Sequence, residues 1–319
     1  MTLPPPSIPD SEIQEVTLSA ELISRELLRS RLFSIEGLEL HLLPGKRFAP
    51  VADAVGLLRE ATYRQQLSGS GDQRDLDGRD SHYDHLLLIE PGSGALAGAA
   101  RLQFLPKHCE TDDLPDGSQS YLEHVYPGIK ARLTSLGNHL EIGRVALASR
   151  FQKQPHSLMA LFRGGLLIAA RSGYDTLHGL VSYNHFAHSE PVNQAFLSGL
   201  MRPPYLQSQP SLPAPRHPLN TVQACDEPNP ITNIQALELN IREQLSDAFR
   251  LPVLLRQYVN LMDAKVCGLS LARDFNQITE ILMAADLSRI PRERLNYFID
   301  VPHESIYQHF SWYRGRVIL

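Results

Sequence analysis

The feature that most constrains this chain is a strand, helix, strand unit near its middle. Residues 140–148 and 176–182 are apolar runs of strand length, and residues 157–172 between them have the pattern of a buried helix. Ser157, shortly after Pro155, is the expected N-cap, and Gly173 stands where a helix C-cap belongs. Two strands joined by a helix of this length run parallel. The unit therefore predicts a sheet with at least one parallel pair.

The other segments predict antiparallel strands around this unit. A hairpin is expected over residues 84–105, where Pro91 to Gly94 separates two apolar strands. Further strands are expected at 38–43, 263–268 and 278–285, and helices at 48–67, 233–249, 251–261 and 291–298. The chain is therefore predicted to form an α/β (α+β) domain with a mixed sheet over residues 37–300.

Three segments fall outside this pattern. Residues 1–36 are a predicted N-terminal extension with an amphipathic helix, whose apolar stripe consists of Ile23, Leu27, Leu28 and Leu32. Residues 202–232 contain eight prolines and no apolar period, which is typical of a cover loop or a functional lid. Residues 301–319 are a predicted C-terminal tail. Accessory segments are thus expected at both ends, with one long loop inside the domain.

Composition excludes several classes of protein. The chain of 319 residues has 43% hydrophobic and 20% charged residues and a formal net charge of −5, so it has no basic field to hold nucleic acid. Three separated cysteines argue against a disulfide framework and a thiolate metal site. The N-terminus has no signal-peptide pattern, and no run is long enough to cross a bilayer. We expect a cytoplasmic protein, with peripheral contact with the inner membrane left open.

Charged residues inside apolar strands mark the first candidate site. Glu141 and Arg144 interrupt the run 140–147 three positions apart, so strict alternation would place them on opposite faces. A bulge at Gly143 would bring both onto one face, as is common beside active sites. The alternative is that one of them points to solvent. Arg101 is a third charge in an apolar strand, and an ion pair with a loop aspartate is its structural interpretation.

The loop at residues 74–85 is the densest polar cluster, with four aspartates, two arginines and two histidines. A calcium loop is disfavoured because the terminal glutamate is absent and the arginines would oppose the ion. A solvated loop with local aspartate turns is the plain alternative. The third interpretation is a substrate-facing loop, in which Asp77 and Asp80 receive a cationic group or support an arginine.

Signatures of other enzyme classes are absent from the sequence. It contains no dinucleotide-binding glycine motif, no phosphate loop, no Gly-x-Ser-x-Gly and no His-Glu-x-x-His. His185 and His188 have no acidic companion at ligand spacing, so we expect no metal. Nucleotide-binding proteins, serine hydrolases and zinc proteases are therefore disfavoured.

Several blocks in order resemble the bacterial ornithine N-acyltransferases, the lyso-ornithine-lipid synthases often called hemolysin-like. The block from Arg74 to Leu86 is similar to their Arg-Asp-x-Asp-x-Phe-Asp-x-x-Cys-Asp-His-Leu signature, with Arg79 and Tyr83 as departures. Glu141-Ile-Gly-Arg144 resembles their Glu-Leu-Gly-Arg, and residues 173–182 resemble their Gly-Tyr-Asp-x-Leu-Phe-Gly-x-x-Ser. Residues 251–276 resemble their C-terminal pattern. The resemblance spans about residues 37–298.

This resemblance implies a GNAT-type acyltransferase fold, in which two parallel strands splay apart and pantetheine lies between them. It is similar also to the acyl-homoserine-lactone synthases, although their early tryptophan is missing here and the sole tryptophan is Trp312. The usual pyrophosphate loop is replaced by residues 149–154, which favours acyl carrier protein over coenzyme A as the thioester donor. The implied acceptor is the α-amine of an amino acid, and no cofactor is permanently bound.

The implied site residues fall into three groups. Glu141 and Arg144 are catalytic; Arg59, Arg101, Asp77, Asp80 and Ser182 bind the acceptor; and Val145, Ala146, Leu147, Arg150 and Lys153 meet the acyl donor and its pantetheine arm. The predicted function is transfer of a fatty or 3-hydroxy fatty acyl group to ornithine. Acylation of glycine or another amine, and a catalytically silent GNAT fold that binds lipid or carrier protein, are the alternatives.

Overall fold

A computed structural model describes residues 15–66, 68–107, 120–207, 210–273, 275–290 and 293–294. Its core is one eight-stranded sheet with the order β1-β2-β3-β4-β5-β6-β8-β7. The strands are β1 (Arg31–Ile35), β2 (Leu38–Leu43), β3 (Asp84–Glu90), β4 (Ala95–Leu105), β5 (His139–Leu147), β6 (Thr176–Tyr183), β7 (Lys265–Ala272) and β8 (Ile278–Asp286). β5 and β6 are parallel, and the other neighbouring strands are antiparallel. The predicted mixed sheet is confirmed.

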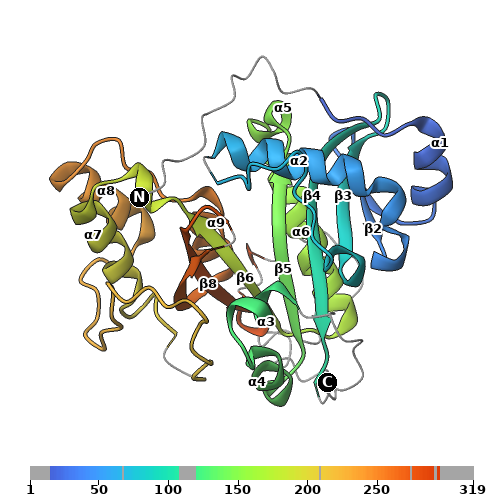
Figure 1. Cartoon of the computed structure of the whole chain (residues 1–319). Helices are drawn as coiled ribbons and strands as arrows, with labels where there is room; N and C mark the ends of the chain where they lie inside the picture. Colours follow the sequence, from blue (N-terminus) through green and yellow to red (C-terminus); the bar gives the residue numbers. More distant parts are fainter. Residues whose placement is uncertain are drawn as a thin grey trace.

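Helices cover both faces of the sheet because its central strands are apolar on both sides (Figure 1). The helices are α1 (Ala20–Leu22), α2 (Ala52–Gln65), α3 (Tyr121–Val125), α4 (Ile129–Leu136), α5 (Ser149–Gln152), α6 (Pro155–Ser172), α7 (Glu190–Leu200), α8 (Ile234–Gln244) and α9 (Val253–Met262). Leu86 and Leu88 of β3 belong to the core that includes α6, whereas the alternating Leu87 and Ile89 belong to the core that includes α2.

The parallel strands β5 and β6 pair only at their beginnings. His139, Leu140 and Glu141 lie opposite Thr176, Leu177 and His178, and after this the strands separate, as Figure 1 shows. Gly179 lies at the branch point, where a Cβ atom would stand only 2.8 Å from the carbonyl oxygen of Ile142. A glycine is therefore required for the close approach at the point where the two strands part.

A bulge in β5 follows the branch point, which is one of the two alternatives that the sequence left open for Glu141 and Arg144. Arg101 lies opposite Gly143 but Ala99 lies opposite Ala146, so β5 carries one extra residue at Arg144 and Val145. Arg144 has a φ of +52°, which is in the left-handed region that non-glycine residues rarely adopt. On a regular strand, side chains three positions apart point to opposite faces. The extra residue changes this, and Glu141 and Arg144 line the same cavity.

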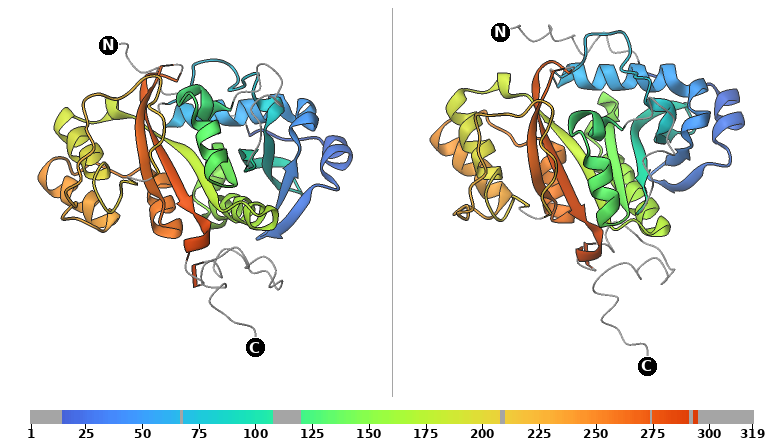
Figure 2. Two further views of the ribbon diagram at one scale, coloured as in Figure 1. Left: turned by 90° about the horizontal axis from the view of Figure 1, so that it is seen from below. Right: turned by 60° about the horizontal axis from the view of Figure 1, so that its bottom comes forward.

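Helices α7, α8 and α9 gather at the β6–β8 end of the sheet, opposite the end where α1 lies (Figure 2). The proline-rich segment 202–232 is irregular where described, as predicted, and runs along β7. Its bridges join Leu206 to Val266 and Pro218 to Ser270. The described part of this segment supplies no residue to the main cavity. It covers the edge strand β7, which would otherwise expose unpaired main-chain groups.

The N-terminal segment differs from its prediction. The expected helix ends at Leu27 after one π-helical turn, Ile23–Leu27, because Ser30 donates both its N–H and its hydroxyl to the Leu27 carbonyl. Leu32 consequently lies on strand β1, and Leu28 is exposed. The sheet therefore begins before residue 37.

Several other helix and strand boundaries differ from those predicted. Helix α6 is capped at Gln154, not Ser157, because Pro155 occupies the first helical position. Gly173 ends it in the left-handed conformation, as expected. Helix α8 stops at Gln244, and β7 starts at Lys265 because Asp263 turns with a φ of +51°. Most of the helix expected at 291–298 and all of the tail 301–319 lie outside the described residues.

The branch point allows a test of the fold. Gly179→Ala should lower the free energy of unfolding by about 1–3 kcal/mol, since the new methyl group must displace the Ile142 carbonyl. Gly143→Ala is the matched control, because a Cβ there meets no described atom within 4 Å. Chemical denaturation measures both variants. Equal midpoints for the two would contradict the role given to Gly179.

Candidate active site

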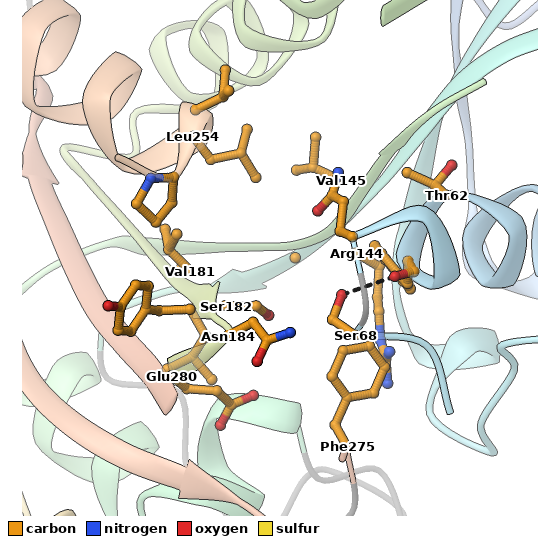
Figure 3. A pocket seen from close by; sticks show the side chains of 18 of the residues that line it. Thr62, Ser68, Arg144, Val145, Val181, Ser182, Asn184, Leu254, Phe275 and Glu280 are labelled. Atoms are coloured by element: carbon orange, nitrogen blue, oxygen red, sulfur yellow. Dashed lines mark hydrogen bonds between the residues drawn. The ribbon is translucent and has the colours of Figure 1, made fainter. Parts of the chain in front are cut away.

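The separation of β5 and β6 opens a cavity of about 600 Å³. Figure 3 shows Arg144 and Val145 on one side of it, and Val181, Ser182, Asn184 and Glu280 on the other. The start of α9 and residues of α2 complete the walls. Because the strands do not pair here, main-chain groups as well as side chains border the space. The cavity is thus formed where β5 and β6 stop pairing.

Glu141 is a buried carboxylate at the edge of this cavity. It is 4% exposed, and its Oε1 accepts hydrogen bonds from the Tyr83 hydroxyl at 2.6 Å and the Leu122 N–H at 3.3 Å. Among the described residues, its Oε2 has no hydrogen-bond partner. Burial raises the pKa of Glu141 above its usual range, although Tyr83 and Arg101 act in the opposite direction. One oxygen is therefore held by hydrogen bonds, and the other is buried without a described partner in a residue that borders the cavity.

Three arginines around the cavity are paired with aspartates of the loop 74–80. Arg59 Nη1 lies 2.8 Å from Asp80 Oδ1, and Arg101 Nη1 lies 3.0 Å from the same oxygen. Arg101 also lies 3.2 Å from Asp77. A buried guanidinium needs such a partner, since its charge is otherwise unstable in the core. Asp77 and Asp80 thus support arginines, which is one of the roles that the sequence suggested for them.

Arg144 is the third member of the network. Its Nη1 lies 2.8 Å from Asp75, and its guanidinium lies over the rings of Tyr121 and Phe275 at 5.5 and 5.2 Å. Burial raises the pKa of Asp75, with Arg144 acting against it. The left-handed backbone of Arg144 turns this side chain into the cavity, so strain at the bulge places a charge there.

The charges of the network set the ionisation of Asp80. Burial alone would raise the pKa of this carboxyl, but Arg59 and Arg101 outweigh that effect and hold its pKa well below its usual range. Asp77 also has a lowered pKa, because Arg101 and Arg144 outweigh its burial. Both aspartates therefore stay charged and bound to arginines.

The structure brings some predicted site residues together and separates others. The residues that line the main cavity are Arg101, Glu141, Arg144, Val145, Leu147 and Ser182. Those outside its lining are Arg59, Asp77, Asp80, Ala146, Arg150 and Lys153. Arg59 is fully buried under Asp80, and Arg150 pairs with Glu15 at 2.8 Å and also with Glu90. Arg150 thus forms ion pairs at the surface.

A narrow apolar extension continues from the main cavity. It shares Ile142, Gly179 and Tyr258 with the main cavity and has a volume of about 20 Å³. Its other lining residues are Phe162, Gly165, Leu177, His178, Met262, Ala264, Met283 and Ala285. Apart from His178 this lining is apolar. The lining suits hydrocarbon, but the space holds only about one water-sized group, so an acyl chain enters only when the lining side chains move apart.

Three important residues were missed at the sequence level. Tyr83 and Tyr121 connect the buried carboxylates, and Glu280 of β8 lines the cavity while only 3% exposed. Glu280 stands alone in the apolar run 278–285, which is the same signal that marked Glu141. The two tyrosines have no such signal, because a tyrosine in a sequence does not indicate whether its hydroxyl meets a distant carboxylate.

Within the described ranges, no three histidine, cysteine, aspartate or glutamate side chains are grouped as a metal site would require. None of the helices in that part of the chain is long and apolar enough to span a membrane.

Residues 58–161 match the model of the Acetyltransferase (GNAT) domain. The match begins in α2, includes β3, β4 and β5, and ends in α6, so it contains the bulge and Glu141. The chain therefore has a GNAT-type acyltransferase domain, and its fold is the GNAT fold, with a mixed sheet flanked by helices.

Three solved structures with a similar chain trace are described below. FeeM, an N-acyl amino acid synthase from uncultured soil microbes, is 13% identical with a TM-score of 0.43, and the match covers 82% of this chain and 98% of that one. The acyl-homoserine-lactone synthase LasI is 10% identical with a TM-score of 0.42, covering 83% and 98%. The loading GNATL domain of CurA from Lyngbya majuscula is 12% identical with a TM-score of 0.38, covering 78% and 98%. No curated protein sequence matches the chain.

The arginine network predicts a large stability effect. Asp80→Asn should reduce the free energy of unfolding by about 3–5 kcal/mol, because it leaves two buried guanidinium groups without their shared carboxylate. Asp72→Asn is the control, since Asp72 is exposed in the same loop. Denaturant titration compares the two. The network would lose its assigned role if both variants unfolded like the parent protein.

Proposed function

We propose that this protein is an N-acyltransferase that moves a fatty acyl group from a carrier-protein thioester to the α-amine of an amino acid. Ornithine is the proposed acceptor, on the sequence resemblance. The observation that carries the proposal is Glu141, a buried carboxylate with one unpaired oxygen, in the lining of a cavity between separated strands. The GNAT domain match supports acyl transfer as the reaction class.

Aminolysis of a thioester requires a base. The acceptor arrives as an ammonium, which has no lone pair for attack, so a proton must leave before the C–N bond forms. Glu141 Oε2 accepts this proton, directly or through a water, while Tyr83 holds Oε1. The neutral amine attacks the carbonyl carbon, the C–S bond breaks, and Glu141 passes the first proton to the departing thiolate. The nitrogen loses its second proton as the amide forms, and this proton leaves through Glu141 to water. The raised pKa of Glu141 makes it a stronger base for this step.

The separated strands supply the donor site. A pantetheine arm carries amide groups, and the unpaired edges of β5 and β6 offer main-chain partners to it. The bulge at Arg144 and Val145 directs backbone toward the reacting carbonyl, where an N–H near Val145 or Ala146 stabilises the developing oxyanion. The acyl tail then lies along the apolar wall of the main cavity and enters the extension past Gly165 as the side chains that line it move apart.

The acceptor lies on the polar side of the cavity. Arg144 holds its carboxylate, because this guanidinium reaches the cavity and has further N–H donors beyond the one that meets Asp75. Arg101 contributes positive charge from beneath Tyr83, at 4.3 Å from the ring. The reacting amine is thereby placed toward Glu141.

Acyl carrier protein is the proposed donor, with a coenzyme A thioester as the alternative. Residues 149–152 form the short helix α5 in place of a pyrophosphate loop, which supports the carrier protein. A fatty product would leave through the apolar rim at the start of α9, where Val253 is 52% exposed. Peripheral contact with the inner membrane from the cytoplasm is part of the proposal.

Glu141→Gln tests the proposed base. The variant should lose about a hundredfold or more in kcat, since the amide cannot accept the proton. Its thermal stability should not fall, because Gln still accepts the Tyr83 hydrogen bond and removes a buried charge. The parent rate should decrease as the pH falls below the raised pKa of Glu141, and the variant should lack this dependence.

Mass spectrometry of lipid extracts from cells expressing each protein, together with thiol release from acyl carrier protein in vitro, gives the readout. A Glu141→Gln protein that is fully active would refute the assigned base. A parent protein that forms no acyl-amine from any carrier-bound or coenzyme A donor would refute the proposed function in favour of a silent binding protein.

Substitutions at Gly165 test the proposed position of the acyl tail. A Cβ at this position meets Ile142 at 3.5 Å, an ordinary contact, but larger side chains would fill the extension. Gly165→Leu should therefore shift donor preference to chains shorter by several carbons. Gly165→Ala is the control and should keep the parent profile. Competition among carrier-bound donors of graded length measures the shift, and an unchanged profile in Gly165→Leu would place the tail elsewhere.

A further inference from the structure

A row of buried polar side chains continues from Glu141 across the sheet. In the strand register Glu141 lies opposite Gln103 of β4 on one side and opposite His178 of β6 on the other. Gln103, Glu141 and His178 are 8%, 4% and 4% exposed. Each has a side-chain atom without a hydrogen-bond partner among the described residues, namely Gln103 Oε1, Glu141 Oε2 and His178 Nδ1. Buried polar atoms of this kind need partners, so three unpaired atoms on adjacent strands mark a site for a polar ligand or water.

The three side chains share the face of the sheet that α3 and α4 cover. Leu105 and Leu180 lie two positions after the β4 and β6 members of the row, and they pack in the core that includes α3 and α4. Leu140, one position before the β5 member, packs in the core that includes α6. Side chains alternate between the two faces of a strand, so the row lies on the α3 and α4 side. Neighbouring strands are about 4.8 Å apart, a spacing at which one water can bridge the three unpaired atoms.

The row continues from His178 to a second histidine. Nε2 of His178 lies 2.9 Å from Nδ1 of His139, so one of these nitrogens donates its proton to the other. Burial lowers the pKa of His178 to about 3 and the pKa of His139 to about 4, so both rings are neutral at neutral pH. A neutral imidazole has one N–H and one bare nitrogen. Each ring can therefore accept a proton at one nitrogen while it gives up the proton at the other.

His139 brings the row close to the surface at the end of α4. Its Nε2 also has no hydrogen-bond partner among the described residues, and a Cβ on Gly137 would stand 3.7 Å from it. The Leu133 carbonyl, in the last turn of α4, acts against burial and favours a protonated ring. Ser135 and Leu136, next to Gly137, are exposed. The far end of the row is thus separated from solvent by little more than one glycine.

Charged side chains of the described structure do not trap a proton on the two rings. Besides burial, the ionisation of His178 depends on His139, and that of His139 depends on the Leu133 carbonyl. Lys130, which is buried on α4, exerts no such effect. A proton that reaches this pair is therefore free to move on.

The proposed reaction needs an exit for one proton in each turnover. An ammonium and a thioester give an amide and a thiol, so one proton is left over, and it reaches Glu141 as the amide forms. The substrates fill the cavity at this moment. The row behind Glu141 offers a path that the substrates do not occupy, because Gln103 and His139 lie outside the cavity lining.

We propose that His178 and His139 form the route by which this proton leaves, and that Gln103 positions the water that links Glu141 to His178. The inference rests on the proposed function, which places the proton on Glu141. His178 and His139 carry the proton away from the base and do not touch the substrate.

The transfer conserves protons at every step. The Glu141 carboxyl gives its proton to the water, and the water gives one to Nδ1 of His178. His178 passes its Nε2 proton to Nδ1 of His139, and His139 releases its Nε2 proton to solvent. Exchange with water, through a transient imidazolium, restores the first tautomer of each ring before the next turnover.

Replacement of either histidine tests the route. His178→Asn and His139→Asn should each lower kcat about tenfold or more, because the chemistry at the cavity is intact but the proton leaves slowly. The KM values for donor and acceptor should not change. Thiol release from acyl carrier protein measures the rates. Imidazole, a small proton carrier, should restore the kcat of His139→Asn in proportion to its concentration and should leave the parent rate unchanged.

His41→Asn is the matched control. His41 is 2% exposed on β2, where its Nδ1 lies 3.1 Å from the Leu27 carbonyl oxygen. This variant should keep the parent kcat and should not respond to imidazole. An unchanged kcat in both His178→Asn and His139→Asn, or a loss in His139→Asn that imidazole does not restore, would overturn the route.

A substitution at the exit serves if the histidine variants do not fold. Gly137 has an extended backbone with a φ of 176°, which any residue adopts, so a larger side chain is accommodated there. Gly137→Leu should cover Nε2 of His139 and lower kcat, whereas Gly137→Ala should keep the parent rate. A folded Gly137→Leu protein with the parent kcat would overturn the route.

Nitrogen NMR of protein labelled at histidine separates this proposal from the one on which it rests. Glu141→Gln cannot release a proton to the shared water, so it should shift the Nδ1 signal of His178, which the spectrum of His178→Asn assigns. Glu60→Gln, a change at a glutamate that is 2% exposed and outside the cavity lining, should not shift it. A shifted signal without acyl transfer from any donor refutes the proposed function alone. An unshifted signal in Glu141→Gln overturns the route, whatever the activity.

Discussion

The pairing of three arginines with three aspartates is the interaction on which the site depends. Arg59 comes from α2, Arg101 from β4 and Arg144 from the bulge of β5, and one loop supplies all their acidic partners. None of these guanidinium groups is stable in the core without a countercharge. The loop is thereby bound to the sheet, and the helix, the two strands and the loop keep one arrangement around the cavity.

This pairing also explains why the two kinds of carboxylate behave differently. Asp80 lies against two guanidinium groups and its pKa is lowered, whereas Glu141 is buried beside a tyrosine hydroxyl and its pKa is raised. Arg101 could have suppressed the basicity of Glu141, but its Nη1 atom is directed to Asp77 and Asp80. Arg101 still lowers the pKa of Glu141, but burial outweighs this effect, so Glu141 stays suited to accept a proton.

Much of this arrangement was predictable from local sequence. Apolar runs located the crossover, and a glycine between two charges located the bulge within one residue, because both features follow from short-range periodicity. The predicted helix extended to Leu32, which lies on β1, because the apolar spacing fits a helix and does not show that Ser30 ends the turn. The partners of the loop aspartates, and the Tyr83–Glu141 contact across 58 positions, depend on tertiary packing that no local pattern encodes. Glu280 had a visible signal, but the cavity it borders could not be placed without the fold.

The short contact between β5 and β6 has a mechanical consequence. Three residue pairs are the whole ladder between the two strands in the described structure, so five strands on one side and three on the other meet along a brief seam. Such a seam can act as a hinge, and the width of the gap beyond it sets how an extended ligand fits. Beyond these three pairs, the facing main-chain groups of β5 and β6 make no ladder with each other in the described structure. The proposed donor arm, which carries amides, would hydrogen-bond to both strands there and so join the two parts of the sheet.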